Sequence, residues 1–318
     1  MRRITPVAHV DRATLHLLTA VAPRKDAGSS PTGIVGRCLA RRLLDAGDRV
    51  RVLAEPGQTD GWPDGTDLVE GSVTRPLDHA AAFAGVGTVF LAGAVADTTP
   101  DVVRLARDAG AAKVVVLSSH GTEYEPDYPP ETWFWLAIEH AVERSGLRWT
   151  HIRPSAVMGA AIEGTYPATG SDWPETIRGE RTVREAFLQS GYYPFIHEDD
   201  LAAVAAVAMR TDDHVGAVLE AVGPPISTRS RLAGIGRAIG CEITGVEVSP
   251  EDSRAIWRRH GWTDSGIDVT LYALREYHIR LDELTAWTDA QRPSVADLIG
   301  RRPRSFDDWA TEHAHLFR

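Results

Sequence analysis

The stretch Leu15-His-Leu-Leu-Thr-Ala-Val21 decides the fold of this chain, together with the segment Thr32-Gly-Ile-Val-Gly-Arg37 that follows it. The first is an apolar run of strand length, and in the second a glycine pair opens a segment whose apolar residues recur at helical spacing. Another apolar run, Val50-Arg-Val-Leu-Ala54, comes next. This order of strand, helix and strand predicts the opening unit of a Rossmann-like sheet, in which dinucleotide phosphates lie over the helix N-terminus.

The connection between the first strand and its helix is unusually long. Thirteen residues separate Thr19 from Gly33, where a Rossmann turn needs only a few, and the first glycine of the usual motif is missing. The inserted loop has three open interpretations. It folds into the nucleotide site and blocks it, it is a solvated loop, or it closes over the phosphates through Arg24, Lys25 and Ser29.

Composition excludes several classes of protein. Hydrophobic residues make up 43% of the 318 residues and charged residues 25%, which is typical of a globular protein with an ample core. The net charge of −10 argues against a nucleic-acid partner or an anionic membrane surface. No apolar run has the length of a membrane span and no signal peptide is visible, so we expect a cytoplasmic protein. Its two cysteines lie far apart, and we expect no metal site.

Strand and helix patterns alternate through the first half of the chain. Residues 15–19, 50–54, 87–91 and 113–118 are expected to be neighbouring parallel strands, because apolar runs alternate there with amphipathic segments. The fold class is therefore α/β, a doubly wound parallel sheet with a smaller, mainly helical C-terminal substrate lobe. We expect a core from residues 1–158, completed by about 193–223, and a covering lobe from 159–192 and 224–318. Asp199 or Asp200 is expected to cap a helix.

Four ordered segments carry a resemblance to a known family. They are Thr32-Gly-Ile-Val-Gly-Arg37, Val115-Val-Leu-Ser-Ser119, Ser145-Gly-Leu-Arg-Trp-Thr-His-Ile-Arg-Pro154 and Pro194-Phe-Ile-His-Glu-Asp-Asp-Leu-Ala202. With them the chain resembles the NmrA-like atypical short-chain dehydrogenase/reductase proteins from about Leu15 to its C-terminus. The resemblance implies either an NAD(P)H-dependent reductase or a cofactor-binding regulator without turnover.

The glycine pair and the end of the second strand supply the candidate cofactor site. Gly33 and Gly36 permit close approach of a pyrophosphate, or simply tight packing of the helix. Glu55 stands about twenty residues after the glycines, where an acid accepts hydrogen bonds from the adenosine ribose and repels a 2′-phosphate. NAD is thus favoured over NADP, although the insertion leaves open whether a dinucleotide binds. The expected cofactor-binding residues are Thr32, Gly33, Ile34, Val35, Gly36, Glu55 and Ser118.

The catalytic pair of ordinary short-chain dehydrogenases, a tyrosine with a lysine four residues later, is absent. The positions where this pair would stand fall near Glu131 and Trp135. The only lysines, Lys25 and Lys113, follow no tyrosine at that spacing. Another proton donor is therefore required. His120 is the first choice, because histidine titrates near neutrality, although a loop histidine is often an exposed bystander. The complete set of catalytic candidates is His120, Ser119, Tyr128 and Glu131.

Aromatic residues gather in the segments expected to cover the substrate. The candidate substrate-binding residues are Tyr124, Trp133, Trp135, Met158, Trp173 and Tyr192. We therefore favour an enzyme, a reductase of a small aromatic or polyketide-like metabolite such as a quinone compound. Two alternatives stay open: a non-redox enzyme (cyclase, dehydratase or isomerase) on a scaffold whose nucleotide site is lost or altered, and a non-catalytic cofactor-binding sensor. The expected partner is a small molecule, and a homodimer is an open alternative to a monomer.

Overall fold

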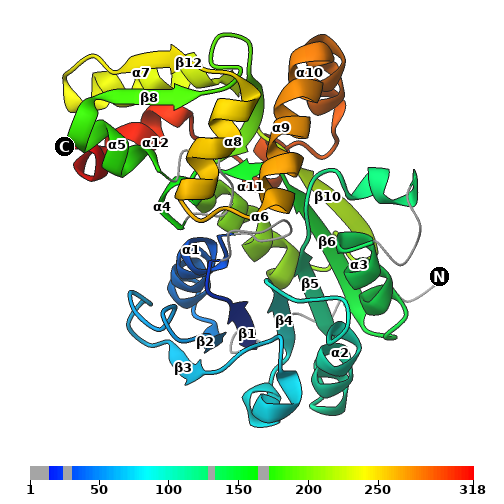
Figure 1. Ribbon diagram of the computed structural model, residues 1–318. Helices are drawn as coiled ribbons and strands as arrows, with labels where there is room; N and C mark the ends of the chain where they lie inside the picture. Colours follow the sequence, from blue (N-terminus) through cyan, green and yellow to red (C-terminus); the bar gives the residue numbers. More distant parts are fainter. Residues whose placement is uncertain (1–13, 24–30, 128–132, 164–171) are drawn as a thin grey trace.

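A parallel sheet forms the centre of the molecule (Figure 1). The computed structural model describes residues 14–23, 31–127, 133–163 and 172–318. In this described part the sheet has seven strands in the order β10-β6-β5-β4-β1-β2-β3, every pair parallel. The strands are β1 (Leu15–Ala20), β2 (Arg49–Ala54), β3 (Asp67–Glu70), β4 (Thr88–Leu91), β5 (Lys113–Leu117), β6 (Arg148–Pro154) and β10 (Ala217–Ala221). The predicted fold class and the four predicted neighbouring strands are confirmed.

Helices cover both faces of the sheet because alternate strand residues point to opposite sides. Leu18 of β1 packs with helices α1 (Thr32–Asp45) and α6 (Glu198–Arg210), while its neighbour Leu17 packs with α2 (Thr99–Asp108) and α3 (Trp135–Glu143). The 3-10 helix η1 (Pro76–Phe83) also lies on the second side. The continuous apolar strands of the sequence are thus explained by burial on two faces.

The second half of the chain builds two smaller sheets and a group of helices. Strands β7 (Ala156–Val157), β9 (Tyr192–Ile196) and β11 (Pro225–Ser227) form one sheet, and β8 (Thr182–Glu185) pairs in parallel with β12 (Thr244–Glu247). The helices and 3-10 helices are η2 (Thr122–Asp127), α4 (Ala160–Glu163), α5 (Trp173–Glu180), α7 (Thr228–Ile239), α8 (Pro250–Arg259), α9 (Asp264–Ile279), α10 (Leu281–Ala290), α11 (Val295–Ile299), α12 (Phe306–Glu312) and η5 (Ala314–Phe317). The weak periodicity of residues 159–192 predicts a covering segment without a sheet, and β8 corrects that prediction.

Helix α6 begins earlier than predicted, because its N-cap lies two residues before Asp199. His197 is the N-cap, and its Nδ1 atom accepts a hydrogen bond of 3.1 Å from the backbone N–H of Asp199. The prediction of Asp199 or Asp200 as the cap was wrong, because both carboxylates already lie inside the helix. Asp199 pairs with Arg42, and Asp200 accepts the backbone N–H of Arg304. No helix in the described residues is long and apolar enough to cross a membrane.

Candidate functional site

The residues on either side of the insertion after β1, Val21 and Thr32, are hydrogen-bonded to each other. Thr32, the first residue of α1, accepts a hydrogen bond of 2.9 Å from the backbone N–H of Val21 and donates one of 3.0 Å to the carbonyl of Val21. This clamp holds the helix start against the end of β1, so residues 22–31 leave and return at one place. The Thr32 hydroxyl therefore binds the backbone of Val21, and its contact with a cofactor stays a prediction. Arg24, Lys25 and Ser29 lie outside the described residues.

The first N–H groups of α1 lie beside a carboxylate of this chain. Pro31 stands at the N-cap and has no side-chain acceptor to offer. The Glu163 carboxylate lies next to the backbone N–H groups of Gly33 and Ile34, with Oε1 2.7 Å from the place that a Cβ atom of Gly33 would take, and it pairs with Arg37 at 2.8 Å. Burial raises the pKa of Glu163, although Arg37 and the two N–H groups lower it. Because these donors bind one anion, they also suit the phosphate of a dinucleotide.

The two glycines of the motif have different neighbours. A Cβ atom at Gly33 would lie 1.8 Å from Gln58 Oε1 and 2.7 Å from Glu163 Oε1, so only glycine admits polar groups so close to the helix. A Cβ at Gly36 would lie 2.8 Å from Trp62 Cη2. Gly36 therefore makes room for an indole ring, which favours the packing interpretation for this residue.

The side chains of Ile34 and Val35, the next residues of α1, pack in the protein. Ile34 acts through its N–H group and packs its side chain near Gly159. Val35 is fully buried in the core, and its N–H donates to the carbonyl of Pro31 at 3.3 Å. Val35 is thus part of the helix and the core, and its N–H is not available to a phosphate.

Glu55 follows β2 and is already hydrogen-bonded. One carboxylate oxygen accepts the backbone N–H of Ala22 at 2.8 Å, and the other accepts the hydroxyl of Ser72. Glu55 therefore ties the residue where the insertion begins to the end of β2. A carboxylate oxygen has more than one lone-pair site, so the contact with a ribose hydroxyl stays a prediction.

A buried ion pair organises the end of β5. Ser118 donates a hydrogen bond of 2.6 Å to Glu139, which accepts two more from Arg153 at 3.0 and 2.6 Å. Burial raises the pKa of Glu139, but the hydrogen bonds from Arg153 and Ser118 outweigh it, and the pKa is lowered. Ser118 thus holds Glu139, and its contact with a cofactor stays a prediction; Ser119 donates to the carbonyl of His120 at 3.2 Å.

His120 joins this strand end to the C-terminal helices. Its Nε2 atom lies 3.0 Å from the hydroxyl of Tyr277 on α9, and its Nδ1 atom lies 3.7 Å from the Glu220 carboxylate on β10. The His120 ring also contacts Trp287 of α10, with ring centroids 4.9 Å apart. Of the described catalytic candidates, His120 has the contacts of a proton-transfer residue.

Sequence reasoning missed Tyr277 because 157 positions separate it from His120 and its helix carries no motif. It missed Glu163 because the surrounding segment has weak periodicity.

Tyr128 and Glu131 lie outside the described residues, as does the side chain of Tyr124. The remaining substrate candidates are not brought together. Trp135, the first residue of α3, lies in the core together with residues of α2, whereas Met158 and Trp173 lie in the core of the second half.

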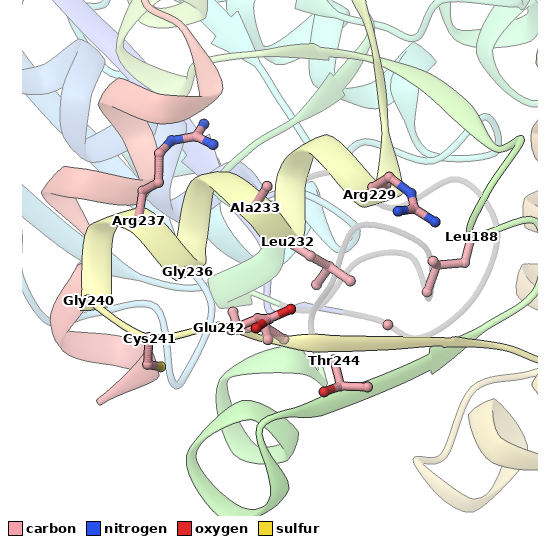
Figure 2. Close-up of a pocket in the computed structure, with 12 residues that line it drawn as sticks. Leu188, Arg229, Leu232, Ala233, Gly236, Arg237, Gly240, Cys241, Glu242 and Thr244 are labelled. Carbon is pink, nitrogen blue, oxygen red and sulfur yellow. The ribbon is translucent and has the colours of Figure 1, made fainter.

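Trp133 and Tyr192 are half-buried, and the Trp133 ring contacts His140 at 5.7 Å. Cavities among the described residues include two in the second half of the chain. The larger, of about 740 Å³, lies between α7 and β12 and is lined by Leu232, Cys241 and Thr244 (Figure 2). The other, of about 560 Å³, includes Trp173 in its lining. Among the described residues, no candidate of the cofactor or catalytic sets lines either cavity.

Comparison with known proteins gives a consistent result. A family model described as NAD(P)H-binding matches residues 31–186. The (4-alkanoyl-5-oxo-2,5-dihydrofuran-3-yl)methyl phosphate reductase of Streptomyces griseus is 31% identical over 292 residues, which cover 90% of this chain and 96% of the relative. Citrobacter triphenylmethane reductase complexed with NADP(H) has a TM-score of 0.65 at 16% identity, covering 93% of this chain and 99% of that one. An NADPH-dependent quinone oxidoreductase from Escherichia coli, complexed with NADPH, has a TM-score of 0.64 at 16% identity, covering 95% and 100%.

Proposed function

The chain belongs to the NmrA-like atypical short-chain dehydrogenase/reductase family, and we propose that it is an NAD(P)H-dependent reductase of a small carbonyl compound or conjugated alkene. The Streptomyces relative supports this reaction type, because its substrate is named as a 2,5-dihydrofuran that carries oxo and alkanoyl groups. Such a ring double bond is conjugated with a carbonyl group and accepts hydride at carbon. The family model supports a bound dinucleotide.

The described residues divide into a phosphate-binding group and a proton-donating group. The N–H groups of Gly33 and Ile34 and the guanidinium of Arg37 are the donors that would hold the phosphates. Glu55 would face the adenosine ribose. When bound, the nicotinamide supplies a hydride, and the protein orients the substrate and supplies a proton.

The single observation that carries the proposal is the hydrogen bond between Tyr277 and His120. Reduction adds a hydride to one atom of the substrate and a proton to its partner, the carbonyl oxygen or the adjacent carbon. The Tyr277 hydroxyl lies 3.0 Å from His120 Nε2, so a proton given to the substrate by either group is replaced from the other. The Glu220 carboxylate lies 3.7 Å from the other ring nitrogen, Nδ1. This pair takes the place of the missing tyrosine–lysine dyad.

The rings around this pair support a flat apolar substrate of the aromatic or polyketide-like kind. Trp287 contacts His120, and Tyr193 contacts Tyr277 with centroids 5.3 Å apart. We propose that residues 159–192 and 224–318 form the substrate-covering lobe, since α9 and α10 bring Tyr277 and Trp287 to the end of the Rossmann sheet (Figure 1).

The test is oxidation of NADH and NADPH in the presence of unsaturated lactones, quinones and aromatic ketones. Tyr277→Phe and His120→Gln are each expected to lower kcat by about 10²- to 10⁴-fold, the usual contribution of a positioned proton donor. Tyr272→Phe is the matched control, because Tyr272 lies on the same helix but is 60% exposed. Equal kcat for Tyr277→Phe and wild type would remove Tyr277 from the mechanism. Product formation without a nicotinamide cofactor would favour the non-redox alternative.

A further inference from the structure

Helix α4 is fixed directly beside the start of α1 (Figure 1). The residue before it, Gly159, lies so close to Ile34 that an added Cβ would be 3.0 Å from two Ile34 side-chain carbons. The backbone N–H of Gly159 donates to Glu198 at 3.1 Å, which holds this residue against α6. The position of α4 is therefore set by backbone and core contacts, and its last residue, Glu163, reaches the N-terminus of α1.

Glu163 occupies the donors that a cofactor phosphate requires. Its side chain is only 7% exposed, and its carboxylate lies directly in front of the backbone N–H groups of Gly33 and Ile34, with Oε1 2.7 Å from the place that a Cβ atom of Gly33 would take. Arg37, one turn into α1, pairs with Glu163 Oε1 at 2.8 Å. The other oxygen, Oε2, is buried and has no hydrogen-bond partner among the described residues. A buried carboxylate oxygen without a partner is costly, so a better-matched anion displaces this one readily.

We propose that Glu163 is an internal competitor of the cofactor phosphate, which holds the N-terminal amides of α1 and Arg37 until a dinucleotide displaces it. The inference rests on the proposed function only for the identity of the ligand. A pyrophosphate and the Glu163 carboxylate are both negative and use the same two N–H groups, so they exclude one another. When Glu163 leaves, Arg37 loses its carboxylate partner and becomes available to the phosphate. Glu163 thereby sets the affinity for the cofactor.

The test measures binding and needs no turnover. Calorimetric titration of the full chain with NADH, NADPH and inorganic pyrophosphate is compared for wild type and Glu163→Gln, which keeps the shape and removes the charge. Glu163→Gln is expected to bind all three ligands at least about tenfold more tightly, a change of about 1.4 kcal/mol. Arg37→Gln is expected to weaken binding of the same ligands, because it removes the cation.

Glu251→Gln is the matched control, since it removes the same charge from the exposed first turn of α8. Equal affinities of wild type and Glu163→Gln would overturn the proposal, and so would equal tightening by the control. Failure of every variant to bind pyrophosphate or NADH would also overturn it, because the amides would then not be a phosphate site. Glu163→Asp, whose shorter side chain retreats from the amides, replaces Glu163→Gln if circular dichroism shows that Glu163→Gln does not fold.

This experiment and the test of the reductase proposal can fail independently. Tighter binding by Glu163→Gln without turnover of any substrate would support the role of Glu163 as a competitor and count against the reductase. Turnover together with unchanged dissociation constants would support the reductase and overturn the role of Glu163.

Discussion

Replacing Glu139 with glutamine is expected to lower the free energy of unfolding by about 3 kcal/mol. Glu139 and Arg153 are 1% and 13% exposed, and they form two hydrogen bonds of 3.0 and 2.6 Å. Removing one partner of a buried ion pair typically costs about 3–5 kcal/mol, because the other charge stays buried. Glu220 lies 3.6 Å from Arg153 and compensates part of that charge, which places the cost at the lower end of the range.

Urea denaturation at pH 7, followed by tryptophan fluorescence, measures this loss. Asp101→Asn breaks the exposed Arg104 pair of 2.9 Å and is expected to cost less than about 1 kcal/mol. A loss below about 1 kcal/mol for Glu139→Gln would refute the reasoning. The hydrogen bonds of Arg153 and Ser118 lower the folded-state pKa of Glu139 against its burial. The ionised Glu139 therefore stabilises the fold above its unfolded pKa of 4.5, and this stabilisation is lost as the pH falls through the folded-state pKa. We expect this pH dependence in the wild type and not in Glu139→Gln.

Two further predictions concern a histidine and the cofactor site. Burial lowers the pKa of His16 from 6.5 to about 4, so the folded protein keeps it neutral and stability falls by about 3 kcal/mol as the pH drops from 6.5 toward 4. His16→Gln should flatten this dependence in a pH series of denaturation midpoints, whereas the exposed control His315→Gln should not. Glu55→Arg should shift preference from NADH toward NADPH, because it removes a repelling charge and adds an attractive one. An unchanged ratio of the two dissociation constants would show that Glu55 acts only through its bonds to Ala22 and Ser72.

The fold could be predicted because its signals are local. Each buried parallel strand is a short apolar run, as in residues 113–117, and such runs alternate with amphipathic helices. The strand β8 was missed because its partner among the described strands is β12, about sixty residues later. Its alternation of buried and exposed positions covers only four residues, which is too short to stand out from a loop.

The candidate site could be predicted only where its residues follow a strand or open a helix. Gly33 and His120 satisfy that condition. Tyr277 and Glu163 do not, since they reach the site through packing of α9 against β9 and of Gly159 against Ile34. Ser118 was correctly placed after a strand and Thr32 at the start of a helix. However, their hydroxyl groups bind Glu139 and Val21, and no sequence pattern distinguishes a hydroxyl that holds the backbone from one that holds a ligand.

The hydrogen bonds between Thr32 and Val21 bear on the cofactor site that we propose. Because Thr32 clamps Val21, the start of α1 lies at the end of β1. The backbone N–H groups of Gly33 and Ile34 therefore stand at the strand end, and the Glu163 carboxylate lies beside them. Under our proposal, the described group that a dinucleotide must displace from this place comes from α4. The affinity for NAD(P)H would then depend on how easily Glu163 gives up its contacts with Arg37 and the helix.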